Sequence, residues 1–214
     1  MSRAPRVQRL LIDGPAGELE SLLEMPADAG APRHYGVVCH PHPLFGGTME
    51  NKVAHTLARS LHEAGMPSVR FNFRGVGASA GSYAEGEGET HDALAVLAWA
   101  RARWPAAEPL LLGFSFGGVV AIRAAAQVET ERLVTVAPAI GRIALDGALP
   151  RCPWLIVQGD ADDVVAPREV LDWAAGLSPP PTIALLAGAG HYFHGRLTDL
   201  KDAVTAFLKQ KPGQ

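Results

Sequence analysis

Short apolar segments alternate with amphipathic segments along most of this 214-residue chain. Each apolar segment has the length of a buried strand. In the segments between them, hydrophobic residues recur every three or four positions, as they do in helices. Strands that alternate with helices need crossover connections, which favour parallel pairing and helices on both faces of the sheet. The alternation therefore predicts an α/β fold with a mostly parallel central sheet of about eight strands.

The predicted elements follow one another in a regular order. Strands are expected at Val7–Asp13, Glu18–Glu24, Gly36–Cys39, Val69–Phe73, Leu110–Phe114, Leu133–Ala137, Trp154–Gln158 and Thr182–Leu186. Helices are expected at Val53–Leu61, from Thr90 as the capping residue to Ala98, and at Val119–Gln127, Pro167–Trp173 and Leu197–Leu208. The turn sequence at residues 14–17 is typical of a hairpin, which adds an antiparallel pair at one edge of the sheet.

Charge and composition exclude several functional classes. The 19 basic and 22 acidic side chains give a net charge of −3, so no basic surplus is available for nucleic-acid phosphates or anionic lipid. The hydrophobic content of 48% supports a large core, and the length suits a single domain over residues 1–214. Two cysteines provide no disulfide framework, and no apolar run resembles a signal peptide or a membrane span. We therefore expect a cytoplasmic protein that has neither nucleic acid nor membrane as a partner.

The pattern Gly-x-Ser-x-Gly, which is typical of a nucleophilic serine, occurs twice. The copy around Ser79 lies in a glycine-dense stretch with no helical stripe directly after it, so we interpret Ser79 as a flexible loop residue. The copy around Ser115 follows an apolar strand and precedes a helix. Such a turn needs small flanking residues and places the serine at a helix N-terminus, where developing negative charge is favoured. Ser115 is therefore the predicted nucleophile.

A serine nucleophile needs a base, and two histidines follow Ser115 in the chain, at His191 and His194. His191 comes directly after a Gly-x-Gly turn that follows the last predicted strand, where an imidazole can approach the serine closely. His194 lies three residues further on and suits a solvated or capping role. We predict His191 as the base.

The acid that orients the base is expected after the strand that ends at Gln158, where three carboxylates follow Gly159. Asp160 suits a turn role, because its carboxylate can accept hydrogen bonds from nearby backbone N–H groups. The spacing alone leaves the choice between Asp162 and Asp163 open.

An oxyanion hole would complete the site. The N–H of Phe116, the residue after the nucleophile, is one expected donor. The second is expected from the loop at residues 40–47, where two prolines have no N–H. We favour the N–H of His42 as this donor, with Leu44 as the second choice.

These residues together resemble the α/β-hydrolase superfamily over nearly the whole chain. The family pattern places the acid at the last position of Gly-x-x-Asp, which corresponds to Asp162. The segments 40–43, 46–49, 51–53 and 70–77 (HPHP, GGTM, NKV and RFNFRGVG) are similar to those of a small group of bacterial serine hydrolases. Only residues 138–153 separate two of the predicted strands where many relatives carry a lid, so no lid domain is expected.

The resemblance and the residues together predict a serine hydrolase that cleaves an acyl ester or thioester through a Ser-His-Asp triad and an acyl-enzyme, without a cofactor. Apolar residues in or beside the loops of the site are candidates for binding the substrate: Leu44, Phe45, Phe114, Tyr192 and Phe193. One alternative is a binding module without catalysis. Another is a metal-dependent hydrolase that uses His40 and His42, although no third ligand is evident and no metal is expected.

Overall fold

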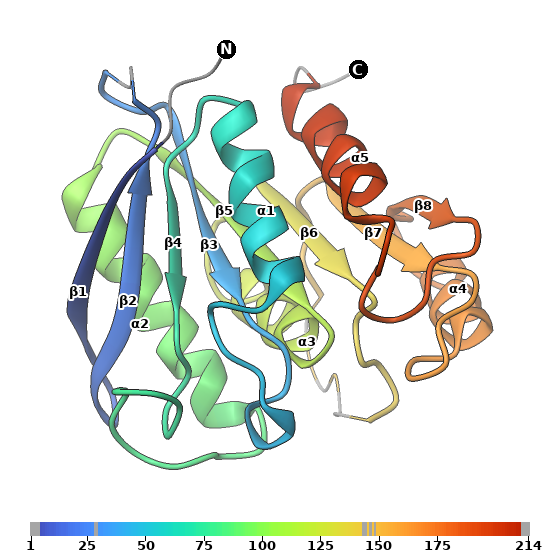
Figure 1. The fold of residues 1–214 in the computed structure, drawn as a ribbon, viewed down its shortest axis with the longest axis horizontal. Helices are drawn as coiled ribbons and strands as arrows, with labels where there is room; N and C mark the ends of the chain where they lie inside the picture. The colour runs from blue at the N-terminus through green and yellow to red at the C-terminus, as the bar shows by residue number, and fades with distance from the viewer. Residues whose placement is uncertain (1–4, 28–29, 143–144, 146, 148, 211–214) are drawn as a thin grey trace.

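The computed structural model describes residues 5–27, 30–142, 145, 147 and 149–210, and within them eight strands form one sheet (Figure 1). The strands are β1 (Arg6–Gly14), β2 (Gly17–Met25), β3 (His34–Cys39), β4 (Ser68–Phe71), β5 (Glu108–Phe114), β6 (Arg132–Val136), β7 (Trp154–Gly159) and β8 (Thr182–Leu186). Their order across the sheet is β1-β2-β4-β3-β5-β6-β7-β8. β2 pairs antiparallel with β1 and with β4, and all other neighbours are parallel. The predicted mostly parallel sheet with an antiparallel N-terminal hairpin is therefore confirmed.

Helices cover both faces of the sheet (Figure 1). They are α1 (Lys52–Glu63), α2 (Glu87–Arg103), α3 (Phe116–Ala125), α4 (Pro167–Ala175) and α5 (Leu197–Lys209), and a short 3₁₀ turn covers Pro43–Phe45. α1 and α5 pack on one face, while α2, α3 and α4 pack on the other. The two apolar layers exclude water from both sides of the central strands, which explains their nearly continuous hydrophobic sequences.

The start of α2 differs from the prediction. The helix begins at Glu87 rather than after Thr90, because the carboxylate of Glu89 accepts the N–H groups of Ala84 (2.9 Å) and Gly86 (2.8 Å). A carboxylate that binds these free amides caps the helix N-terminus and complements its dipole. Thr90 lies inside the helix, where its hydroxyl donates to the Gly86 carbonyl at 2.6 Å.

The carboxyl ends of the parallel strands meet at one edge of the sheet, at the bottom of Figure 1. The loops after β3, β5, β6, β7 and β8 therefore lie close together there, as is usual for ligand sites in open α/β sheets. Residues 138–153, which connect β6 to β7, are too few to form a lid domain over this edge. In the part of the chain that the structure describes, no helix combines the length and hydrophobicity needed to cross a membrane.

Leu57 provides a test of the packing of α1 on the sheet, because its side chain is completely buried in the core. We expect Leu57→Ala to lower the free energy of unfolding by about 2–5 kcal/mol through lost burial and a residual cavity. Leu11→Ala is the matched control, since Leu11 is 51% exposed on β1, and its effect should stay within about 0.5 kcal/mol. Urea unfolding of the three proteins measures both values, and equal losses would contradict the described packing.

Candidate active site

Ser115 occupies a strained turn between β5 and α3. Its backbone has φ 55° and ψ −116°, a conformation that residues other than glycine rarely adopt. Two hydrogen bonds hold it there: the Ser115 N–H donates to the Val136 carbonyl at 2.9 Å, and the Ala139 N–H donates to the Ser115 carbonyl at 3.2 Å. The turn is therefore braced by the chain that leaves β6, and it presents the serine hydroxyl at the carboxyl edge of the sheet.

The glycines on either side of Ser115 allow the backbone to approach its neighbours closely. A Cβ on Gly113 would lie 2.1 Å from the Gly117 carbonyl oxygen, and one on Gly117 would lie 2.3 Å from the His40 carbonyl oxygen. Neither contact leaves room for a methyl group. The small residues predicted for this turn are thus a steric requirement of the packing between β5, α3 and the end of β3.

Hydrogen bonds connect the three residues predicted as nucleophile, base and acid. His191 Nε2 lies 3.1 Å from Ser115 Oγ, and His191 Nδ1 lies 2.9 Å from Asp162 Oδ2. All three side chains are buried, with Ser115 7% exposed and His191 4% exposed. The ring of Phe114 packs against the imidazole at a tilt of 37°, with ring centroids 4.9 Å apart. An ionised Asp162 places the neutral ring's proton on Nδ1, so Nε2 can accept the proton of the serine.

Asp162 is held as a carboxylate by its neighbours. Its Oδ1 accepts the N–H groups of Val164 (2.9 Å) and Val165 (2.8 Å), and its Oδ2 also accepts from the Gln158 amide at 3.1 Å. Burial opposes its ionisation, but hydrogen bonds from His191, Val165 and Val164 outweigh that cost and lower the pKa of Asp162. Gln158 was not among the predicted site residues; the signal for it is a polar residue at the end of an otherwise apolar strand.

The other acidic and histidine candidates lie apart from the serine. Asp160 accepts the Gly188 N–H at 2.6 Å, which connects the loop of the acid to the loop of the base and agrees with its predicted turn role. Asp163 and His194 are exposed.

A cavity of about 600 Å³ opens in front of the serine. Its lining residues come from all the loops of this edge: Pro41, His42, Phe45, Gly46, Gly47, Asn51, Tyr83, Ser115, Phe116, Ala139, Arg142, Val164, Val165, His191 and Tyr192. Of the five predicted substrate-binding residues, Phe45 and Tyr192 line this cavity. They are also among the most exposed hydrophobic side chains of the described residues, at 81% and 47%, so the site opens to solvent.

The expectation that Phe114 and Phe193 contact the substrate is wrong. Both are completely buried in the core between the sheet, α1 and α5, where Phe114 supports His191 instead. Leu44 is 65% exposed and does not line the cavity either. Proximity in sequence to a catalytic residue does not determine which way a side chain points, because successive residues of an extended segment face opposite sides.

Several lining residues were not predicted, among them Tyr83, Asn51 and Arg142. Tyr83 lies in the glycine-rich segment before α2, and its ring is 5.9 Å from that of Phe116. The Arg142 guanidinium donates to the Val164 carbonyl and so connects the loop after β6 to the loop after β7. These positions depend on how separate loops fold back over one edge, for which the local sequence carries no clear signal.

The backbone of the predicted oxyanion hole distinguishes its two candidate donors. The Leu44 N–H donates to His42 Nδ1 at 3.2 Å and is therefore already engaged. The His42 N–H has no hydrogen-bond partner among the residues that the structure describes. Phe116 is the first residue of α3, so its N–H has no partner inside the helix. The geometry favours Phe116 and His42 as donors over Leu44.

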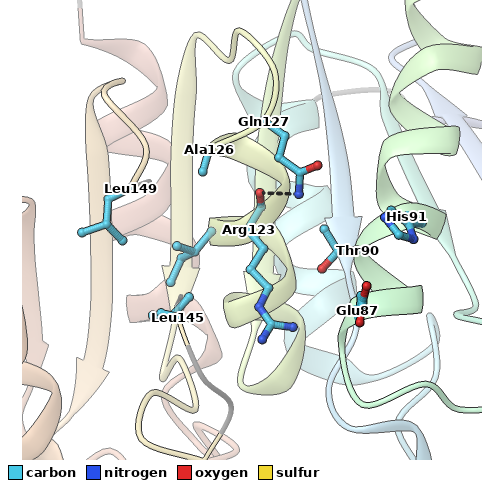
Figure 2. Close-up of a pocket in the computed structure, with 9 residues that line it drawn as sticks. Glu87, Thr90, His91, Arg123, Ala126, Gln127, Leu145 and Leu149 are labelled. Atoms are coloured by element: carbon cyan, nitrogen blue, oxygen red, sulfur yellow. Dashed lines mark hydrogen bonds between the residues drawn. The ribbon is translucent and has the colours of Figure 1, made fainter. Parts of the chain in front are cut away.

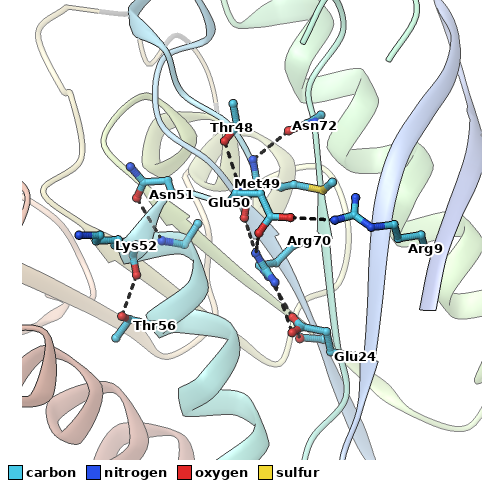
Figure 3. Close-up of polar contacts among 12 residues, drawn as sticks. Arg9, Glu24, Thr48, Met49, Glu50, Asn51, Lys52, Thr56, Arg70 and Asn72 are labelled. Carbon is cyan, nitrogen blue, oxygen red and sulfur yellow. Dashed lines mark hydrogen bonds and ion pairs between the residues drawn. The ribbon is translucent and has the colours of Figure 1, made fainter. Parts of the chain in front are cut away.

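A buried ion pair anchors the loop that follows His42 (Figure 3). Arg70 on β4 pairs with Glu24 on β2 at 2.9 Å, and both side chains are about 95% buried. The Arg70 guanidinium also donates to the Met49 carbonyl, while the Met49 N–H donates to Asn72 at 2.8 Å. Burial alone would raise the pKa of Glu24, but the hydrogen bond and charge of Arg70 lower it. The backbone of Met49, between the cavity-lining residues Gly47 and Asn51, is thus fixed at both its N–H and its carbonyl.

His40 does not have the properties of a metal ligand. Its Nε2 accepts the Phe73 N–H at 3.0 Å, and its Nδ1 lies 2.6 Å from the Pro41 carbonyl oxygen. Burial lowers its pKa to about 3, so the ring stays neutral, and both nitrogens are engaged by the backbone. These bonds leave His40 no lone pair for a metal, which removes one of the two ligands that the metal-dependent alternative requires.

The serine of the first Gly-x-Ser-x-Gly copy has a structural role. Ser79 is buried, donates to the Asn72 carbonyl at 2.7 Å and accepts the Glu20 N–H at 3.0 Å. It is a loop residue as predicted, but these bonds fix it to β2, so the expected flexibility is wrong.

A second cavity of about 420 Å³ lies between α2 and α3 (Figure 2). Its walls include Glu87 and His91 from α2 and Gln127 beyond the end of α3. None of the three connected residues Ser115, Asp162 and His191 lines it. The chemistry of this fold is therefore expected in the first cavity.

Comparison with known proteins identifies the family of the chain. The family model Hydrolase_4, described as serine aminopeptidase S33, matches residues 36–152. The chain belongs to this family of α/β serine hydrolases. In sequence it is similar to the uncharacterized protein RP471 of Rickettsia prowazekii (strain Madrid E), with 33% identity over 211 residues that cover 94% of this chain and 88% of that protein.

Two solved structures resemble the chain over almost its whole length. XC6422 from Xanthomonas campestris, an α/β serine hydrolase without a lid, is 40% identical with a TM-score of 0.92, covering 97% of each chain. An α/β serine hydrolase homologue from Coxiella burnetii is 42% identical with a TM-score of 0.87, covering 93% of this chain and 96% of that one. The expected resemblance to lidless serine hydrolases is confirmed.

Gly117 tests the steric requirement of the turn. We expect Gly117→Ala to lower the free energy of unfolding by about 1–3 kcal/mol and to displace Ser115, because the new Cβ would meet the carbonyl oxygens of Cys39 and His40 at the end of β3. Gly118→Ala is the matched control, since its Cβ would lie no closer than 3.2 Å to Pro138. Urea unfolding and the rate of labelling by a fluorophosphonate measure the two effects, and equal behaviour of both variants would contradict the explanation.

Proposed function

We propose that this hydrolase cleaves acyl esters or thioesters through a Ser115-His191-Asp162 triad and an acyl-enzyme intermediate. The observation that carries the proposal is the continuous hydrogen-bond chain from Ser115 Oγ through His191 to Asp162, at 3.1 Å and 2.9 Å. The order Ser, Asp, His along the chain is the one expected for a nucleophile elbow in an α/β-hydrolase.

The chemistry follows from these contacts. Ser115 Oγ attacks the substrate carbonyl carbon while His191 Nε2 takes its proton, and the N–H groups of Phe116 and His42 stabilise the oxyanion. The C–O or C–S bond to the leaving group breaks as His191 returns the proton to it. Water activated by His191 then hydrolyses the acyl-enzyme and regenerates Ser115. Asp162 fixes the ring orientation and stabilises the imidazolium in both steps.

The size and openness of the cavity favour a small substrate that reaches Ser115 directly from solvent. Aromatic rings of Phe45, Phe116, Tyr83 and Tyr192 line it, and no inserted domain covers it among the residues that the structure describes. A binding module without catalysis is the second candidate. The strained Ser115 backbone argues against it, because strain of this kind is retained where the reaction needs it.

Removal of the nucleophile is the direct test. We expect Ser115→Ala to lower kcat for p-nitrophenyl butyrate by about 10⁶-fold, as in a serine protease that loses its nucleophile, and to abolish fluorophosphonate labelling. The matched control is Ser79→Ala, which changes the serine of the other Gly-x-Ser-x-Gly copy and should still be labelled. Undiminished labelling of Ser115→Ala would refute the assignment, and a panel of esters, thioesters and amides would define the preferred bond.

Variants of Asp162 and of its neighbour Asp163 test which carboxylate is the acid. We expect Asp162→Asn to lower kcat by about 10⁴-fold, because the amide no longer holds His191 in the tautomer that accepts the serine proton. Asp163→Asn should behave like the wild type, since Asp163 is exposed. Steady-state kinetics of the two variants with p-nitrophenyl butyrate measures both effects. A larger loss in Asp163→Asn would assign the acid to that position.

A further inference from the structure

Tyr83 and His42 form a hydrogen-bonded pair in the wall of the active-site cavity. Tyr83 Oη lies 3.3 Å from His42 Nε2, and both residues line the cavity that contains Ser115. Their rings are 5.1 Å apart, and each also packs on the ring of Phe116, at 4.8 Å for His42 and 5.9 Å for Tyr83. The triad chemistry does not use either side chain, so this pair needs a separate explanation.

The neighbouring backbone determines the direction of this hydrogen bond. The Leu44 N–H donates to His42 Nδ1 at 3.2 Å. A backbone amide can only donate, so Nδ1 carries no proton and the neutral ring has its hydrogen on Nε2. His42 Nε2 therefore donates to Tyr83 Oη, and the phenol oxygen acts as the acceptor in this pair.

Burial keeps both side chains in their neutral forms near pH 7. It lowers the pKa of His42 despite the opposing charge of Glu89. Burial, together with the charges of Glu89 and Glu85, raises the pKa of Tyr83. The imidazole thus remains uncharged, and the phenol keeps its hydrogen.

The hydroxyl hydrogen of Tyr83 remains available to a ligand. Its oxygen accepts from His42, and no acceptor for its hydrogen occurs among the residues that the structure describes. The rings of Phe45 and Phe116 that share this wall carry no acceptor atoms. A partly buried donor without a partner favours a ligand that supplies an oxygen at that point.

The backbone around Tyr83 is held rigidly. The Ala84 N–H, directly after Tyr83, donates to Glu89 at 2.9 Å, and the Gly86 N–H donates to the same carboxylate at 2.8 Å. Glu89 is itself completely buried at the start of α2. The hydroxyl is therefore positioned before substrate binds, which lowers the entropy cost of a hydrogen bond to it.

We propose that Tyr83 is a specificity-determining residue that donates a hydrogen bond to an oxygen atom in the acyl portion of the substrate. The preferred substrates are then esters or thioesters with an ether, hydroxyl or carbonyl oxygen close to the reacting carbonyl. His42 is a positioning residue that orients the phenol. The inference rests on the proposed function and deepens it.

The assignment to the acyl portion follows from the position of the pair. His191 returns its proton to the leaving group, so the leaving group lies on the His191 side of Ser115. Tyr83 and His42 pack on Phe116 instead, beside the expected oxyanion donors. The part of the substrate that stays bonded to Ser115 is the part that this pair can contact.

Two isosteric substrates test the inference. p-Nitrophenyl methoxyacetate and p-nitrophenyl butyrate differ by one oxygen in place of one methylene in the acyl chain. We expect Tyr83→Phe to lower the ratio of their kcat/KM values, methoxyacetate over butyrate, by about tenfold relative to the wild type. Their different intrinsic reactivity cancels in this comparison. A partly unfolded preparation lowers both rates equally and leaves the ratio unchanged.

Tyr35→Phe is the matched control, because Tyr35 is buried in the core against Trp104. The ratio of kcat/KM values of this variant should equal that of the wild type. An unchanged ratio in Tyr83→Phe, with Ser115 still labelled by a fluorophosphonate, would overturn the inference and leave the proposed function intact. Wild-type protein that resists labelling would overturn both.

A second pair of substrates tests the position of the oxygen. Butyrates of 2-methoxyethanol and 1-butanol differ by one oxygen in the leaving group. An effect of Tyr83→Phe confined to this pair would place the oxygen in the leaving group and refute the assignment to the acyl portion.

Discussion

Close backbone contact at the turn between β5 and α3 is the constraint on which the site depends. The chain at Gly117 lies against the carbonyl of His40, and the chain at Gly113 lies against Gly117 itself. These contacts bring three segments within van der Waals distance at one point: the end of β3, the end of β5 and the start of α3. The same packing places the Phe116 N–H beside the loop that contributes His42. The proposed nucleophile and oxyanion donors thus share one steric arrangement, while the proposed base and acid lie on the loops after β8 and β7.

The loops around this turn are connected to one another rather than to the core alone. Asp160 accepts the Gly188 N–H, which joins the loop after β7 to the loop after β8. Arg142 connects the loop after β6 to Val164 beside the acid. On the other side, Arg70 fixes Met49 from the sheet (Figure 3). A site assembled from several loops can hold its geometry in this way, because hydrogen bonds join neighbouring loops at the edge.

The features that could be predicted from sequence are those that depend on local pattern. The alternation of apolar segments is sufficient for the eight strands, and the strand-turn-helix context distinguishes Ser115 from Ser79. The directions of side chains in loops are not local properties. Phe114 and Phe193 lie in the core although each is near a predicted catalytic residue, and Tyr83 lines the cavity although it is far from all of them in sequence. Those side-chain positions depend on how separate loops fold over one edge of the sheet. The periodicity of hydrophobic residues along the sequence does not predict that folding.

The order of strands has a consequence for how activity depends on local stability. β8 is an edge strand with a single hydrogen-bonded neighbour, and Ile183 and Leu185 on it are 37% and 48% exposed. The loop after β8 carries His191, whereas Ser115 follows a central strand that is paired on both sides. Opening of this edge would separate the imidazole from the serine while the rest of the sheet stayed folded. The hydrolase would then lose its proposed base through a local opening that costs less than global unfolding, so we expect activity to be lost before the rest of the sheet unfolds.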